Sequence, residues 1–188
     1  MRSIPLPAAG KSVVLTFKAE GYVDTVVTVD TGAHRIVLSQ AWTCPEPRTL
    51  LQSSGLCTMG YALPTAIGRK LAEPSRPVVA VVGDGGLDMT LGELLTARDL
   101  RVSIVVVVID DASLALIEMK QRAEKLPSVG VDSGQTLYAE IARAMGGHGV
   151  RVETAAELEE AGREGLARAD TFTLVHAPIE RRAYDGRI

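Results

Sequence analysis

VVAVVGDGGLDMT (Val78–Thr90) and SIVVVVIDDASLALIEMKQ (Ser103–Gln121) are the two stretches that decide the fold of this chain. Each contains an apolar run, Val78–Val82 or Ile104–Ile109, and such Val- and Ile-rich runs are typical of parallel strands buried on both faces. The intervening Thr90–Leu100 carries a helical pattern, so strand, helix and strand form a right-handed crossover. We therefore predict two parallel strands whose carboxyl ends lie at the same edge of a sheet.

Polar residues follow both strands at that edge, GDGG at 83–86 and DDAS at 110–113. Open α/β sheets bind their ligands at the carboxyl ends of the strands. Glycines expose backbone N–H groups to phosphate oxygens, and Mg²⁺ takes oxygen ligands at about 2.0–2.1 Å, often shared with phosphate. Asp84 and Asp111 therefore predict a cation–phosphate site, although an Asp in the position of Asp111 is also a common helix N-cap.

The rest of the chain continues the alternation of strands and helices, which predicts an α/β fold with a doubly wound, mainly parallel sheet flanked by helices. Thr154 and Glu157 form the pattern of a capping box. The stretch 122–134 contains Pro127 and is expected to be a mobile loop with a functional role. Further strands are expected at 23–29, 149–152 and 171–177, a strand or lead-in segment at 12–17, a loop at 42–49, and helices from residue 36 and at 61–72, 137–145 and 155–169.

Composition limits the classes of function. The 188 residues are 46% hydrophobic and 23% charged, which suits one folded domain, 1–188 with a core at 23–178, rather than a disordered chain. A formal net charge of −3 argues against general nucleic-acid binding. No apolar run approaches a membrane span, and the N-terminus has no secretory pattern. Cys44 and Cys57 lack metal-ligand spacing, so we expect free thiols and a cytoplasmic location.

Several stretches occur together in the order and spacing of one known family. They are DTGAHRI at 30–36, TMGYALP at 58–64, GDG at 83–85, the Asp pair at 110–111 and LALIEMKQ at 114–121. With these, the chain resembles the C-terminal diphosphate-binding domain of thiamine diphosphate (ThDP) enzymes, in the acetolactate synthase-like branch of carboligases and decarboxylases. The fingerprint of those enzymes is a GDG followed by an Asn-Asn or Asn-Asp pair.

The resemblance implies a set of residues for the metal and the diphosphate. Asp84 and Asp111 would be side-chain ligands of Mg²⁺, with the main-chain carbonyl of Ser113 as a third protein ligand. Gly85 and Gly86 would offer N–H groups to the diphosphate.

It also implies contacts to the rest of ThDP. His34 would reach the diphosphate from the first strand–helix loop; without the resemblance it would be assigned to capping or packing that loop. Met59 would support the V-shaped cofactor, although Met is otherwise a common gap-filler in cores. The main-chain carbonyl of Cys57 would accept a hydrogen bond from the aminopyrimidine. Gly83 and Leu114 complete the implied cofactor-binding set.

The chain departs from the family pattern at three positions. Asp110 replaces the first Asn of the usual pair and adds a third carboxylate near the diphosphate, which would weaken binding by repulsion unless Lys or Arg compensates. Cys57 stands where Gly is usual. Ala33 stands where some synthases have a polar diphosphate contact.

The family also needs a pyrimidine-binding domain, whose glutamate activates the cofactor and for which these 188 residues have no room. We therefore expect this chain to be one subunit of a split 2-oxo acid decarboxylase or carboligase, pairing with a separate pyrimidine-binding-domain chain as a heterotetramer. A piece of a longer protein would show the same absence. Two other hypotheses stay open: a degenerate, non-catalytic ThDP-domain scaffold, and an unrelated nucleotide-binding α/β domain, although the G-x-G-x-x-G turn of the latter is missing.

Overall fold

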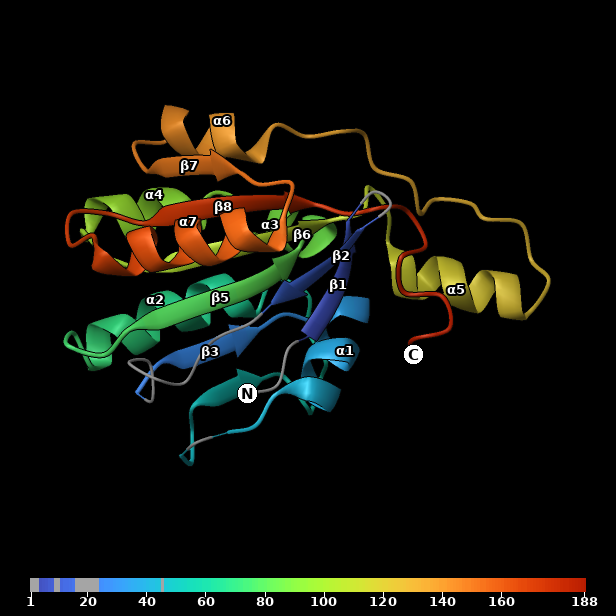
Figure 1. Ribbon diagram of the computed structural model, residues 1–188, viewed down its shortest axis with the longest axis horizontal. Coiled ribbons are helices and arrows are strands. Elements are labelled where there is room, and N and C mark those ends of the chain that lie inside the picture. Colours follow the sequence, from blue (N-terminus) through green and yellow to red (C-terminus); the bar gives the residue numbers. More distant parts are fainter. Residues whose placement is uncertain (1–3, 9–10, 16–23, 45) are drawn as a thin grey trace.

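Parallel strands form the centre of the computed structural model, which describes residues 4–8, 11–15, 24–44 and 46–188 (Figure 1). Within those residues a six-stranded sheet has the order β4-β3-β5-β6-β8-β7, and all of its neighbouring strands are parallel. Its strands are β3 (Val26–Val29), β4 (Leu50–Gln52), β5 (Val78–Gly83), β6 (Val105–Asp110), β7 (His148–Arg151) and β8 (Thr173–Pro178). The predicted parallel α/β sheet is confirmed.

Helices cover both faces of this sheet, as the doubly wound prediction requires. One face packs against α1 (Ala33–Ala41), α5 (Ala115–Ala123) and α7 (Ala155–Ala167). The other packs against α2 (Ala62–Ala72), α3 (Asp84–Asp88), α4 (Glu93–Asp99) and α6 (Tyr138–Ala144). Because successive strand residues point to opposite faces, the continuous Val runs supply both cores.

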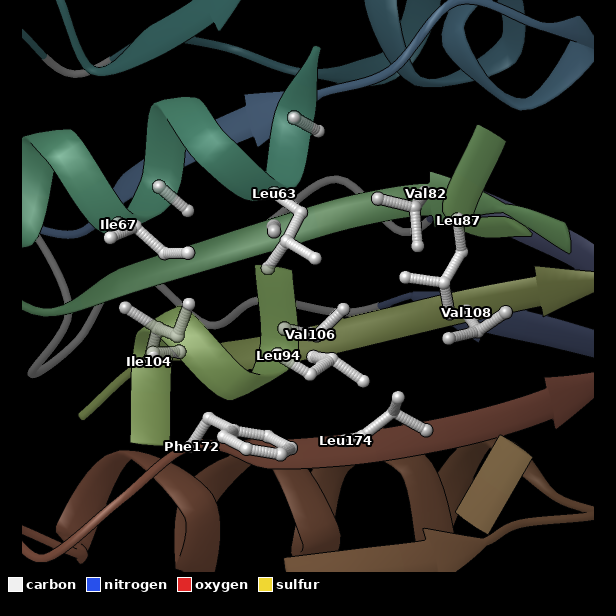
Figure 2. Packing of buried hydrophobic residues seen from close by; sticks show 14 of the residues in the cluster. Leu63, Ile67, Val82, Leu87, Leu94, Ile104, Val106, Val108, Phe172 and Leu174 are labelled. Atoms are coloured by element: carbon white, nitrogen blue, oxygen red, sulfur yellow. The ribbon is translucent and has the colours of Figure 1, made fainter. Parts of the chain in front are cut away.

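The core on the second face shows this alternation directly (Figure 2). Val106 and Val108 of β6 point into it together with Leu174 of β8, and they meet Leu63 of α2 and Leu94 of α4. The intervening residues Val105, Val107 and Ile109 belong to the core on the opposite face. Burial of both faces explains why these strands contain no alternating polar residues.

The crossover between β5 and β6 differs in one respect from the expected helix at 90–100. The chain enters α3 directly at Asp84, and α4 is shorter than the expected segment. The GDGG stretch is therefore the start of a helical turn rather than an open loop. Gly83 pairs with Ile109 in the sheet, so the following residues of β5 and β6 lie at one edge, as predicted.

Most of the remaining elements lie within a few residues of their expected positions, whereas strands β1 (Ile4–Ala8) and β4 were not predicted. Thr154 accepts a hydrogen bond from the Glu157 N–H at 3.2 Å, and the Glu157 carboxylate accepts one from the Thr154 N–H at 3.1 Å, which confirms the capping box. Part of the expected segment 12–17 is strand β2 (Lys11–Leu15), which pairs antiparallel with β1. Val23, Thr16 and Phe17 lie outside the described residues.

The β1–β2 hairpin is not part of the main sheet. It lies against α1 and α7, on the same side of the sheet as those helices (Figure 1). In the described part of the chain, no helix is long and apolar enough to cross a membrane.

Two glycines give a matched test of this packing. A Cβ at Gly149 in β7 would lie 1.9 Å from the carbonyl oxygen of Ala139, whereas a Cβ at Gly162 in α7 would meet nothing within 4 Å. We expect Gly149→Ala to lower the free energy of unfolding by about 3 kcal/mol because main-chain atoms must shift. Gly162→Ala should raise it by about 0.5–1 kcal/mol because alanine favours a helix interior. Urea denaturation measures both, and equal effects of the two substitutions would contradict this packing.

Candidate functional site

A cleft of about 230 Å³ lies at the carboxyl ends of β3, β5 and β6. All ten residues predicted for the cofactor line it: His34, Cys57, Met59, Gly83, Asp84, Gly85, Gly86, Asp111, Ser113 and Leu114. The fold therefore gathers residues from four separate stretches of sequence into one concave surface. Their individual roles toward a ligand stay predictions.

Asp84 is the first residue of α3 and is buried. Its Oδ2 accepts hydrogen bonds from the Ser113 N–H and the Ser133 hydroxyl, both at 3.1 Å. Burial raises the pKa of Asp84 to about 6, and the neighbouring charge of Asp110 adds to that rise, against the hydrogen bonds that lower it. The sequence analysis placed Ser133 in a functional loop but did not identify its contact with Asp84.

Asp111 is the second buried carboxylate of the cleft. Burial raises its pKa to about 7, and the charge of Asp84 is the next largest cause. Its Oδ2 has no hydrogen-bond partner among the described residues. It does not cap a helix, since the N-cap of α5 is Leu114 and no side chain caps it. The N-cap interpretation is therefore wrong, and a buried, unpaired carboxylate oxygen faces a second carboxylate.

The carboxylate oxygens of Asp84 and Asp111 suit a hard cation only if further oxygen atoms complete its coordination. Among the residues that the structure describes, no three His, Cys, Asp or Glu side chains gather to hold a metal ion. Asp84 and Asp111 alone supply two oxygen ligands, whereas Mg²⁺ takes six and usually keeps water or phosphate oxygens among them. The carboxylates thus fit a cation that is shared with a phosphate and with main-chain oxygens such as that of Ser113.

The glycines of the cleft are required by close contacts. A Cβ at Gly85 would lie 2.6 Å from a methyl group of Leu114, and a Cβ at Gly86 would lie 2.3 Å from Oδ2 of Asp30. The absence of side chains at 85 and 86 therefore lets Leu114 and Asp30 pack closely against the first turn of α3.

Asp30 is a buried residue of the site that the sequence analysis did not single out. Its carboxylate accepts hydrogen bonds from the N–H groups of Thr31 at 2.8 Å, Gly60 at 2.9 Å and Tyr61 at 3.2 Å. Burial raises its pKa, and these three bonds oppose the rise. Asp30 therefore ties the end of β3 to the segment that carries Met59. The signal was present, because Asp30 follows an apolar strand as Asp84 does.

His34 lies in the first turn of α1 and is buried. Burial lowers its pKa to about 4, so the imidazole is neutral near pH 7. Its ring packs so closely against Gly32 and Gly83 that a Cβ at either would lie within 3.1 Å of a ring atom. Its Nε2 has no partner among the described residues. The packing interpretation therefore accounts for one side of the His34 ring. It does not account for Nε2, which remains available to a ligand in the cleft.

Met59 and Cys57 also line the cleft. Met59 is half-buried and belongs to neither hydrophobic core, so the core-packing interpretation is wrong. Cys57 has φ +50°, a left-handed conformation that glycine adopts most easily, which gives a physical reason for Gly being usual there. Cys44 and Cys57 are both free and exposed, as predicted.

Asp110 is directed away from the cleft. Its Oδ2 lies 2.8 Å from Nε2 of His176 in β8, and its Oδ1 accepts a hydrogen bond from the Ala112 N–H at 3.0 Å. The partner of this third carboxylate is a buried histidine rather than a Lys or Arg, and its expected weakening of cofactor binding stays a prediction. Asp110 still adds negative charge near Asp84 and Asp111 and raises the pKa of each.

The expected loop 122–134 begins later than predicted, because α5 extends to Ala123. Its far end is tied to the site: Asp132 forms an antiparallel bridge with Ser113, and the Leu114 N–H donates to the Val131 carbonyl at 2.8 Å. The C-terminal tail also contributes Tyr184, which is buried and lines the cleft. No sequence pattern marked Tyr184, since it stands alone in a polar tail. Mobility of this loop stays a prediction.

The raised pKa values of Asp84 and Asp111 predict that the metal-free site lowers the free energy of unfolding in a pH-dependent way. Both carboxyls bind a proton more tightly in the folded protein than in the unfolded chain, so stability falls as pH rises from about 4 to about 7. We expect Asp111→Asn in EDTA to raise the free energy of unfolding by about 1–2 kcal/mol at pH 8 and to change it little at pH 4. Denaturation at both pH values measures this, with exposed Asp24→Asn as the control. An equal gain at pH 4 and pH 8 would contradict the assignment.

Comparison with known proteins gives consistent matches. Residues 30–177 match the family described as "Thiamine pyrophosphate enzyme, C-terminal TPP binding domain". Acetolactate synthase of Bacillus subtilis (strain 168) is 35% identical over 154 residues, which cover 82% of this chain and 27% of that protein. A putative thiamine pyrophosphate-containing protein of the same organism, YdaP, is 32% identical over 160 residues, 85% of this chain and 28% of that protein.

A third relative comes from an archaeon. The probable acetolactate synthase large subunit of Methanococcus aeolicus is 30% identical over 154 residues, 80% of this chain and 26% of that protein. The chain thus spans about a quarter of the length of these relatives.

Proposed function

Because the chain belongs to the thiamine pyrophosphate enzymes and carries their C-terminal TPP-binding domain, of the acetolactate synthase-like branch, we propose that it is the diphosphate- and Mg²⁺-binding part of a ThDP-dependent 2-oxo acid decarboxylase or carboligase. One observation carries the proposal most directly. Asp111, which has a carboxylate oxygen without a partner among the described residues, lines the cleft together with Asp84 and the glycines of α3.

The residues of this chain would each do a defined part of the binding. Asp84 and Asp111 would hold the cation with the main-chain oxygen of Ser113, and the cation would remove the repulsion between the two carboxylates. Gly85 and Gly86 would donate N–H groups to the diphosphate. Neutral His34 would donate or accept at Nε2, the atom that has no other described partner.

The apolar wall would orient the rest of the cofactor. Met59 and Leu114 line the cleft beside Gly85 and would offer apolar contacts to the rings of the cofactor. The main-chain carbonyl of Cys57 would accept from the aminopyrimidine. When bound, ThDP supplies the carbanion chemistry by which a 2-oxo acid loses CO₂, and the protein supplies orientation and electrostatics.

A second polypeptide segment would complete this site. Glu118 is a buried glutamate near the cleft, but its carboxylate accepts from Ser113, Arg181 and Arg182 and so is not free to activate a cofactor. The activating glutamate would come from a pyrimidine-binding domain, either on a separate chain in a heterotetramer or elsewhere in a longer protein. The much greater length of the related acetolactate synthases supports such a requirement.

A thermal-shift titration tests the proposal. We expect the unfolding midpoint to rise only when ThDP and Mg²⁺ are both present, with about 2.7 kcal/mol of stabilisation at a ligand concentration 100 times Kd. Asp84→Ala should abolish the rise, while Asp99→Ala, at an exposed end of α4, should keep it. Stabilisation of Asp84→Ala equal to that of the wild type would refute the metal assignment.

The partner is tested in two steps. A pyrimidine-domain chain is first isolated by pull-down and identified, and the thermal-shift titration is then repeated with that chain present. The complex should consume a 2-oxo acid only with ThDP and Mg²⁺. Absence of stabilisation and of turnover, alone and with that chain, would favour the non-catalytic scaffold instead.

A further inference from the structure

The buried residue Glu118 connects the C-terminal tail to the end of the cleft that is proposed to hold the metal ion. Glu118, in the first turn of α5, is 1% exposed. Its Oε2 accepts the Ser113 hydroxyl at 3.2 Å and Nε of Arg181 at 3.3 Å, and its Oε1 accepts Nε of Arg182 at 3.1 Å. Burial alone would raise its pKa, but the hydrogen bonds from Arg181 and Arg182 outweigh burial and lower it. Glu118 is therefore an ionised carboxylate whose negative charge is balanced by arginines of the C-terminal tail.

Ser113 belongs to a turn that needs such support. Ala112 has φ +52°, a left-handed conformation that costs a residue with a Cβ about 1–2 kcal/mol. The turn is held by side chains: Asp110 accepts from the Ala112 N–H, Asp84 accepts from the Ser113 N–H, and Glu118 accepts from the Ser113 hydroxyl. Asp111, with its unpaired oxygen, lies within this turn.

The tail that binds Glu118 is itself fixed at several points. Arg181 also forms an ion pair with Asp132, the residue that bridges to Ser113. Arg122 of α5 pairs with Asp185 through two hydrogen bonds. Glu118 is thus the point at which the tail, α5 and the turn at 110–113 meet.

We propose that Glu118 is a positioning residue for the metal end of the site, acting through the Ser113 hydroxyl to hold the turn that carries Asp111. This inference rests on the proposed function and adds to it a residue outside the cleft. Groups that orient metal ligands in this way commonly contribute about 10–100-fold to metal affinity. Arg181 and Arg182 serve the same end, because they offset part of the negative charge that Glu118 places near Asp111.

A double-mutant cycle on Glu118→Gln and Ser113→Ala tests the link. Each single variant should raise the Mg²⁺ concentration needed for half-maximal ThDP-dependent stabilisation by about 10-fold. The double variant should be no worse than either single one, because both changes remove the same contact. Ser113→Thr, which keeps the hydroxyl, should restore wild-type Mg²⁺ dependence. Glu153→Gln, which removes an exposed ion pair with Arg151 of β7, is the control for loss of a carboxylate charge.

A second readout does not need the cofactor. The Ser113 amide donates to Asp84, so its hydrogen exchange in the metal-free protein should become faster in Glu118→Gln and in Ser113→Ala and stay slow in Ser113→Thr. Failure of the wild type to bind ThDP with Mg²⁺ would refute the proposed function, while this exchange measurement still decides the role of Glu118.

Two results would overturn the inference. The first is additive losses in the double variant, which would mean that Glu118 and Ser113 act independently. The second is a lower unfolding midpoint of Glu118→Gln with unchanged Mg²⁺ dependence and unchanged Ser113 exchange, which would make Glu118 only an anchor for the tail.

Discussion

Burial of two neighbouring carboxylates, Asp84 and Asp111, is the constraint on which the candidate site depends. They follow neighbouring parallel strands, so the sheet forces their charges together in a poorly solvated place, and their pKa values rise to about 6 and 7. Such a pair destabilises the empty protein near neutral pH and is relieved by a bound cation. The same two side chains are therefore expected to influence both the stability of the protein and the binding of a cation.

The other buried acidic residues near the site each have protein partners, which distinguishes them from Asp111. Asp30 is satisfied by three main-chain N–H groups, Asp110 faces His176, and Glu118 is matched by arginines of the tail. The carboxylate oxygen of Asp111 is left without such a partner in the described structure. Pairing of the surrounding acids keeps the negative charge of the cleft concentrated where a cation would bind.

Because the chain belongs to the thiamine pyrophosphate enzymes, these contacts explain how it accommodates its departures from the family pattern. The departure at Asp110 is accommodated by its turn toward His176, and the departure at Cys57 places a non-glycine residue in a left-handed conformation. Neither change closes the cleft, which all ten residues of the predicted set line. The fold thus gathers the residues proposed to hold the cation and diphosphate of ThDP at one edge of the sheet.

The sequence alone predicts the parallel sheet and the helices on both faces, and its resemblance to the ThDP family implies ten residues of the cleft, although not Tyr184. Apolar runs, glycines and acids at strand ends are local signals, and parallel topology then brings the ends of β3, β5 and β6 together. Only the tertiary structure decided how the acids are paired. Asp110 meets His176 across 66 positions, and Glu118 meets Arg181 across 63. Such partners are chosen by the packing of the tail, α5 and β8, for which no periodicity in the sequence exists.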